Sequence, residues 1–331
     1  MNNETFSLSD AAQLAVVTRS GFVESRHAGS AVVLDADGEI LRELGNPRAL
    51  IYPRSCLKPL QALAVMTSGV QLLPELSVIA MASHSGTADH LALVQQILNL
   101  ADLDASALQC PADIPADRAA RSEVLREGLE PSPMFMNCSG KHAAMLLACV
   151  VNDWPIETYL EPTHPLQLHI KDTVQRFTGE KISVTGVDGC GAPVFAVTIV
   201  GLARATRRLI TSSTTSPFPL HRLAAELYKN ALAHGWILDG QGRPNTVVIN
   251  ELGVFAKFGA EGVMIMGAPN GTSVALKVLD GNLRAATVAS LELLVETGAL
   301  ARGAVDRVLP QLGLAITGGS EVVGEVRATI S

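Results

Sequence analysis

Arg54-Ser55-Cys56-Leu57-Lys58-Pro59 stands where a strand-rich segment of the chain gives way to a helical one. Ser55 and Lys58 are three residues apart, which on a helix places both side chains on one face. Pro59 is tolerated only in the first turn of a helix, so the helix is predicted to begin within a residue or two of Ser55. The serine hydroxyl then lies at the positive end of the helix dipole, where an attacking alkoxide is stabilised.

This stretch allows two interpretations. A lysine whose pKa is lowered by burial and by nearby positive charge accepts the proton of a serine, which makes Ser55 a nucleophile and Lys58 its base. A helix-capping serine followed by a surface lysine gives the same pattern. This stretch alone does not distinguish a catalytic serine from a helix-capping one.

Strands flank a helical middle. They are predicted at residues 14–18, 22–27, 30–34, 39–44, 182–187, 255–266, 273–279 and 322–330. The segment 55–177 is mostly helical by its apolar spacings of three and four, and a further helix is predicted at 283–295. This order favours an α/β fold in which a helical lobe (55–179) is inserted between the halves of a sheet lobe (1–54 and 180–331). A doubly wound nucleotide fold would instead alternate strands and helices throughout.

Composition narrows the functional class. Of the 331 residues, 48% are hydrophobic and 17% charged, which is typical of a compact globular protein. A net charge of −7 without a basic cluster argues against a nucleic-acid partner. Residues 1–10 lack the positive and apolar regions of a signal peptide, and the longest apolar stretch, 192–203, is shorter than the about 20 residues of a membrane span. A cytoplasmic location is therefore expected.

Two further segments combine small residues with a functional side chain. Ser83-His84-Ser85-Gly86 directly follows an apolar run, either as a helix end turning into a cleft or as an ordinary turn. Lys257-Phe258-Gly259-Ala260-Glu261-Gly262 lies between apolar strand residues, and glycine weakens a strand unless something must approach closely. An edge-strand lysine that prevents aggregation is the alternative there.

Two of the five cysteines occur in glycine-rich settings, Asn137-Cys138-Ser139-Gly140-Lys141-His142 and Asp188-Gly189-Cys190-Gly191. Two thiolates with a third donor can hold zinc, but cysteines so far apart do not form a zinc signature by spacing. Two small buried thiols beside tight turns would give the same pattern.

Together these motifs resemble the asparaginase II family, the Rhizobium-type L-asparaginases. The motifs of the preceding paragraphs occur in the family's order, and 23–27 and 280–282 are similar to it as well, so the resemblance covers nearly the whole chain. It implies a serine β-lactamase-like or glutaminase-like fold, a homodimer, and hydrolysis of L-asparagine to aspartate and ammonia.

The resemblance also assigns roles to individual residues. It implies two Ser–Lys pairs, Ser55 with Lys58 and Ser83 with Lys257. It implies a zinc site, structural or substrate-orienting, and further active-site positions. The zinc ligands would be Cys138, Lys141 and Cys190, and the further positions are Arg54, Asp188 and His142.

The chain departs from the family around 233–235 and 243–246, which are not among the expected catalytic positions, so the departures concern the oligomer contacts or the shape of the cleft. Glutaminase is a close alternative, because one methylene gives only about 1–3 kcal/mol of discrimination. A penicillin-recognising hydrolase shares Ser-x-x-Lys, but Phe258 replaces the expected Thr or Ser of its Lys-Thr-Gly element. A non-catalytic metal or thiol protein built on Cys138 and Cys190 would leave both serines and both lysines unexplained.

Overall fold

The computed structural model describes residues 4–330. Its centre is an eight-stranded antiparallel sheet in the order β11-β12-β1-β2-β10-β9-β8, with β3 paired to β2. These strands are β1 (Ala12–Arg19), β2 (Phe22–Leu34), β3 (Ile40–Leu44), β8 (Phe255–Gly259), β9 (Val263–Gly267), β10 (Ser273–Val278), β11 (Ala315–Gly318) and β12 (Glu321–Ala328). Two short ribbons pair β4 (Leu50–Ile51) with β7 (Val197–Thr198) and β5 (Thr185–Val187) with β6 (Pro193–Phe195).

Helices cover the sheet and form a separate group beyond it. The α-helices are α1 (Lys58–Thr67), α2 (Pro74–Ile79), α3 (Ala88–Leu100), α4 (Arg118–Arg126), α5 (Ser139–Val151), α6 (Pro165–Thr178), α7 (Ile199–Ile210), α8 (Pro219–Ala233), α9 (Gly235–Leu238), α10 (Pro244–Leu252), α11 (Leu283–Glu296) and α12 (Arg302–Val308). The 3₁₀ helices are η1 (Leu8–Asp10), η2 (Arg54–Leu57), η3 (Ala105–Ala107), η4 (Pro133–Phe135) and η5 (Leu309–Gln311). Within residues 4–330, no helix is both long and apolar enough to span a bilayer.

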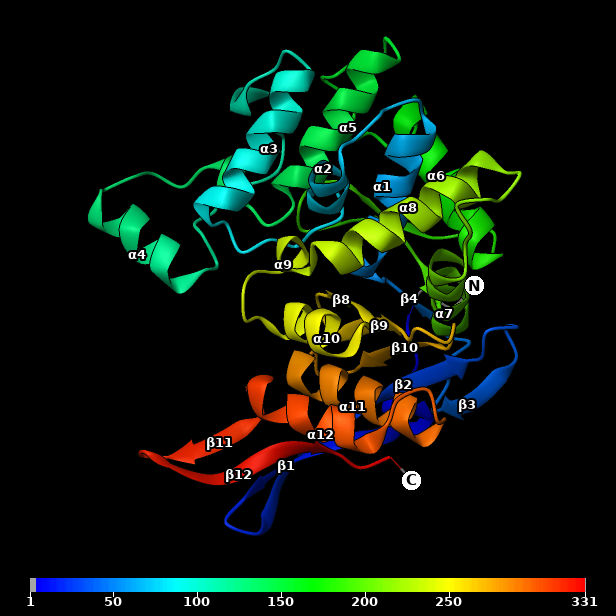
Figure 1. Ribbon diagram of the computed structural model, residues 1–331, viewed down its shortest axis with the longest axis vertical. Coiled ribbons are helices and arrows are strands. Elements are labelled where there is room, and N and C mark those ends of the chain that lie inside the picture. The colour runs from blue at the N-terminus through cyan, green and yellow to red at the C-terminus, as the bar shows by residue number, and fades with distance from the viewer. Residues whose placement is uncertain (1–3, 331) are drawn as a thin grey trace.

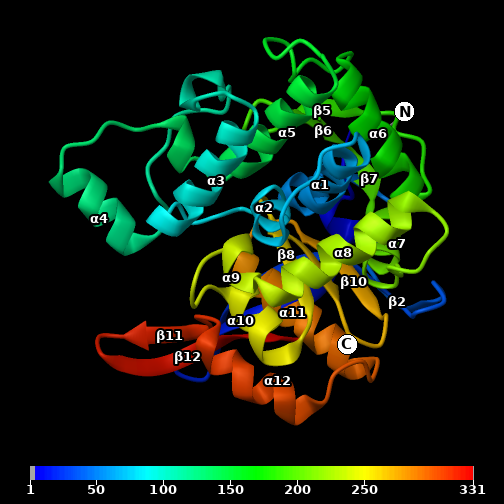
Figure 2. The same cartoon turned by 45° about the horizontal axis from the view of Figure 1, so that its top comes forward.

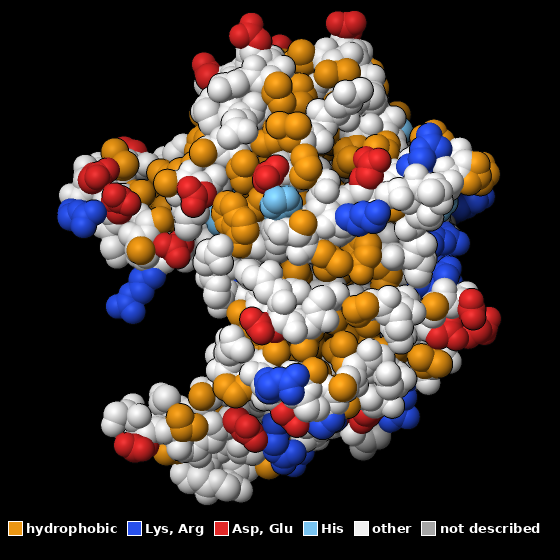
Figure 3. Space-filling model, viewed as in Figure 1, with side chains coloured by type: hydrophobic (Ala, Val, Ile, Leu, Met, Phe, Trp, Pro, Cys, Tyr) orange, Lys and Arg blue, Asp and Glu red, His pale blue; other side chains and the backbone are white. Residues whose placement is uncertain are grey.

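The arrangement has two parts. Helices α7 and α11 pack on the sheet strands β9 and β10. A second group of helices lies above the sheet in Figure 1 and consists of α1, α2, α3, α5, α6 and α8 (Figures 1 and 2). Helix α4 and the β11–β12 hairpin both project from the same side of the molecule, and its surface is hollowed between them (Figure 3). The predicted α/β class, a mainly antiparallel sheet built from both ends of the chain with helices between, is confirmed.

Several predicted elements differ in extent. The two strands expected at 22–27 and 30–34 are one continuous strand, β2. The strand expected at 255–266 is a hairpin, β8–β9, because Glu261 and Gly262 adopt positive φ values of 63° and 70° and turn the chain. The strand expected at 182–187 shortens to β5. The division into lobes at residues 54 and 180 stays a prediction.

The fold places the start of α1 in the interior. Every residue of α1 from Lys58 to Met66 is buried, so this helix packs on all sides. Strand β8 runs against η2, and a Cβ on Gly259 would come within 2.4 Å of the Pro53 carbonyl oxygen. Glycine is therefore required at position 259 for this close approach, which explains the glycine that follows Lys257 in a strand.

Candidate active site

Two buried lysines meet at one serine. Lys58 Nζ lies 3.0 Å and Lys257 Nζ 2.8 Å from Ser83 Oγ. Lys58 also donates to the Ala82 carbonyl oxygen (2.6 Å), and Lys257 donates to that of Phe258 (2.9 Å). Lys58 and Lys257 are 1% and 0% exposed, so neither is a surface lysine. The structure thus brings together residues from α1, from the loop after α2 and from β8.

Burial changes the chemistry of Lys257. It lowers the pKa of this amine from 10.5 to about 7, and the positive charge of Lys58 acts in the same direction. An amine with such a pKa is partly unprotonated at neutral pH and can accept a proton. Within the site, Lys257 therefore has the properties of a general base towards Ser83.

Ser55 lies on the same turn as Lys58. It belongs to η2, its carbonyl oxygen accepts the backbone N–H of Lys58, and residues three apart eclipse in a 3₁₀ helix. The two side chains therefore share a face, and the predicted helix start is confirmed by η2 and α1. Among residues 4–330, however, the Ser55 hydroxyl makes no hydrogen bond, and Lys58 is bonded to Ser83 instead.

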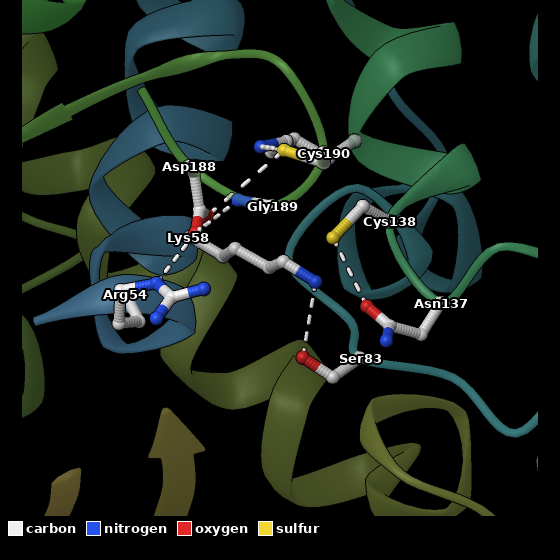
Figure 4. A network of polar contacts seen from close by, with 9 residues as sticks. Arg54, Lys58, Ser83, Asn137, Cys138, Asp188, Gly189 and Cys190 are labelled. Atoms are coloured by element: carbon white, nitrogen blue, oxygen red, sulfur yellow. Dashed lines mark hydrogen bonds and ion pairs between the residues drawn. The ribbon is translucent and has the colours of Figure 1, made fainter. Parts of the chain in front are cut away.

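Arg54 and Asp188 form an ion pair at the edge of the site. Arg54 Nε donates to Asp188 Oδ1 at 2.6 Å, and the Gly189 backbone N–H donates to the same oxygen at 2.9 Å (Figure 4). Burial alone would raise the pKa of Asp188, but the hydrogen bond from Arg54 and the charge of Lys141 outweigh it and lower that pKa. Arg54 has a φ of 53°, a strained value for a non-glycine residue that is typical of functional sites.

The two cysteine loops also converge. Lys141 Nζ donates to Cys190 Sγ at 3.0 Å. The Cys138 thiol donates to Asn137 Oδ1 at 3.0 Å (Figure 4). The pKa of the Cys138 thiol is lowered well below its usual range, first by its hydrogen bond with Cys190 and then by the charges of Lys58 and Lys141, despite burial. Cys190 and the two lysines therefore favour the thiolate form of Cys138, in which this sulfur accepts hydrogen bonds instead of donating one.

These sulfurs fit a thiophilic cation. Within residues 4–330 no group of three or more His, Cys, Asp or Glu side chains is arranged to hold a metal ion, and the third donor here is the Lys141 amine. Thiolates are preferred zinc ligands, whereas an amine binds only after it loses its proton. Burial lowers the pKa of Lys141, but Cys190 and Cys138 outweigh it and raise that pKa. Metal binding at these residues would thus release the proton of Lys141.

His142 is a buried neighbour of this cluster. Its Nδ1 lies 2.7 Å from Tyr159 Oη, which in turn accepts the Gln109 backbone N–H at 3.1 Å. The pKa of His142 is lowered, chiefly by burial, although its interaction with Cys190 opposes the shift. A neutral imidazole that is held by Tyr159 and lies beside Cys190 suits orientation of the cysteine loop better than proton transfer.

The sequence interpretation missed Asp239. The carbonyl oxygen of the preceding residue, Leu238, accepts the backbone N–H of Ser83 at 2.9 Å. The Asp239 carboxylate is 1% exposed, and Arg243 Nε donates to it at 2.6 Å. Burial raises the pKa of Asp239, and its charge in turn acts to raise the pKa of Lys257. A single aspartate before Gly240 has no sequence pattern that separates it from an ordinary turn.

Solved structures with a similar arrangement share little sequence with this chain. A β-lactamase from Mycobacterium bovis is 15% identical with a TM-score of 0.43, and the match covers 81% of this chain and 94% of that one. A Bacillus glutaminase is 12% identical with a TM-score of 0.45, with 82% and 91% covered. At such low identity and TM-score these likenesses say nothing about chemistry. No curated protein matches the chain.

The match to a protein family is far more extensive. The family model described as L-asparaginase II matches residues 15–328. This span includes Ser55, Lys58, Ser83 and Lys257, both cysteine loops and the Arg54–Asp188 ion pair. The chain therefore belongs to the L-asparaginase II family of amidohydrolases.

Proposed function

We propose that this chain hydrolyses the side-chain amide of L-asparagine to L-aspartate and ammonia. The observation that carries the proposal is the Ser83 hydroxyl between two buried amines, one of which has a pKa of about 7. Amide hydrolysis needs a proton taken from a nucleophile and a proton given to the leaving nitrogen. The hydrogen-bonded unit Lys58–Ser83–Lys257 supplies groups for both transfers.

In the sequence of steps expected from the family resemblance, Ser55 attacks the amide carbon while its proton passes to Lys58, which must be unprotonated to accept it. Ser83, paired with Lys257, gives a proton to the departing nitrogen, so that ammonia leaves and an acyl-enzyme remains. Water then hydrolyses the ester, and the serine recovers its proton. Arg54 is the proposed partner of the substrate α-carboxylate and Asp188 that of the α-ammonium.

The contacts favour a second assignment of the two serines. Ser83 has direct hydrogen bonds to both lysines, whereas the Ser55 hydroxyl has none within residues 4–330. Ser83 would then attack, with Lys257 as its base, and Ser55 would assist the leaving group. The reaction and its products are the same in both assignments.

Cys138, Lys141 and Cys190 are the proposed zinc residues. A bound ion would hold the two cysteine loops together and offer a Lewis acid beside the substrate. Cys138 and Cys190 would supply the thiolates, while Tyr159 holds the imidazole of His142 beside the cluster. The homodimer and the cytoplasmic location expected from the sequence remain predictions.

Ammonia release from L-asparagine and, in parallel, L-glutamine tests the proposal. Ser55→Ala is expected to lower the rate by about 10³-fold or more, because the variant loses the nucleophile in the first assignment and the group that assists the leaving ammonia in the second. Ser122→Ala, an exposed serine on α4, serves as the matched control. Acid quenching followed by peptide mass spectrometry then shows whether Ser55 or Ser83 carries the acyl group. Release from L-glutamine alone would change the substrate, and release from neither would refute the proposed activity.

A further inference from the structure

A separate cavity of about 310 Å³ lies beside the catalytic residues. Its polar lining comes from Tyr52, Arg54, Glu261, Lys277 and the N-terminal residues Glu4 and Thr5. Neither serine and neither lysine of the Ser–Lys pairs lines it. Liquid water takes about 30 Å³ per molecule, so the cavity has room for a ligand the size of a small amino acid. Arg54 is the residue that this cavity shares with the candidate active site.

Two cationic side chains line the cavity, and each has at least one N–H group that makes no hydrogen bond within residues 4–330. Arg54 uses Nε for Asp188, and neither of its terminal nitrogens donates a hydrogen bond within residues 4–330. Lys277 Nζ donates to the carbonyl oxygens of Glu261 (2.6 Å) and Val278 (3.2 Å), which leaves one of its three protons. Arginine and lysine placed this way suit a carboxylate that accepts from both.

A carboxylate lines the same cavity. Glu261 lies in the β8–β9 turn, and its side chain accepts no hydrogen bond from any residue of the described part of the chain. A ligand that satisfies all three groups must present a carboxylate and a cation close together. The α-carboxylate and α-ammonium of an amino acid are such a pair.

We propose that this cavity binds the zwitterionic head of a free α-amino acid, with its carboxylate at Arg54 and Lys277 and its ammonium at Glu261. A ligand held there engages the terminal nitrogens of Arg54. Those nitrogens are then withdrawn from the α-carboxylate of a substrate in the active site. An amino acid such as the product L-aspartate would thus raise the KM for substrate from this outer cavity. This effect on KM rests on the proposed function, whereas the binding itself does not.

The test is isothermal titration of the full chain with L-aspartate and with succinate, which lacks the ammonium group. Lys277→Gln is expected to weaken both ligands about 10-fold. Glu261→Gln is expected to weaken L-aspartate by a similar factor and to leave succinate unchanged or tighter. Lys229→Gln, an exposed lysine on α8 that does not line the cavity, is the control and should change neither.

The pattern across ligands decides the outcome. Unchanged L-aspartate affinity in both variants overturns the proposal, and so does equal weakening of both ligands by Glu261→Gln, which indicates a disturbed turn rather than a lost contact. Because Lys277 also bonds two backbone carbonyls, Glu261→Gln is the cleaner variant. If the chain releases no ammonia but shows this pattern, the proposed function fails and the binding site stands. If the chain releases ammonia but does not show this pattern, the proposed function stands and the binding site fails.

Discussion

Replacing Lys257 with methionine is expected to stabilise the protein at neutral pH while abolishing its activity. The fall in the pKa of Lys257 from 10.5 to about 7 corresponds to a cost of about 5 kcal/mol for charging this buried amine. In the unfolded chain the amine is hydrated and stays protonated to about pH 10. Its burial therefore destabilises the native state fully below pH 7, and the penalty fades as the pH rises from 7 towards 10.5.

The size of the effect follows from the contacts. Methionine has a similar length and no charge, so it removes the penalty, which at pH 7 is still about 4 kcal/mol because half of the native amine is neutral. It also loses the hydrogen bonds to Ser83 Oγ and the Phe258 carbonyl oxygen, at about 1 kcal/mol each. We expect Lys257→Met to be about 2 kcal/mol more stable than the wild type at pH 7.

Urea unfolding at pH 7, 8 and 9 measures this difference. It should fall by up to about 1.4 kcal/mol per pH unit and vanish near pH 9, because the unfolded wild type binds one more proton than the native protein in this range. Lys229→Met, at an exposed position of α8, should show no such slope. A stability difference that stays constant from pH 7 to 9 would refute a lowered pKa for Lys257 and with it the role of general base.

Three further variants test neighbouring groups. Asp188→Asn leaves Arg54 without its carboxylate in a partly buried pair, so the free energy of unfolding should fall by about 1–2 kcal/mol and the KM for L-asparagine should rise more than kcat falls. Cys138→Ser should reduce the zinc content, measured by atomic absorption. It should lower the melting temperature clearly and kcat/KM only slightly. An unchanged zinc content would exclude Cys138 as a ligand. Asp239→Asn removes a negative charge that raises the pKa of Lys257, so the acid limb of the pH–rate profile should move to lower pH; a limb that does not move would remove Asp239 from the site.

Local sequence patterns predicted the elements that carry the site. Pro59 restricts where a helix can begin, and the structure starts α1 at Lys58. Residues 35–38, which separate the strands predicted at 30–34 and 39–44, form the turn from β2 to β3, in which Asp35 Oδ1 accepts the backbone N–H groups of Asp37, Gly38 and Glu39. These features depend on residues within a few positions of one another, so the local sequence is enough to predict them.

Contacts between residues far apart in the sequence could not be predicted from local patterns. The i,i+3 spacing of Ser55 and Lys58 predicts that they share a face, but it does not say that Lys58 extends to the loop after α2. Ser83 and Lys257 are joined across 174 positions, because tertiary packing places the loop after α2 beside β8. Asp239 comes near the site for the same reason, because the backbone carbonyl of Leu238 accepts the Ser83 N–H. A backbone contact does not depend on the residue type at position 238, so no motif marks it.

The direction of the hydrogen bonds at Ser83 follows from counting protons. A serine hydroxyl has one proton to donate and two lone pairs to accept. Lys58 donates to Ser83 and to the Ala82 carbonyl oxygen, so the serine is already an acceptor on that side. A neutral Lys257 has two N–H groups and one lone pair, so it can donate one N–H to the Phe258 carbonyl oxygen and direct its lone pair at the Ser83 O–H across the same 2.8 Å contact. Loss of one proton from Lys257, at a pH near 7, thus reverses a single hydrogen bond and turns the Ser83 hydroxyl from a double acceptor into a donor whose proton is ready to leave. This reversal requires only that burial and the charge of Lys58 keep the second amine neutral, which is the physical reason for placing two lysines around one hydroxyl.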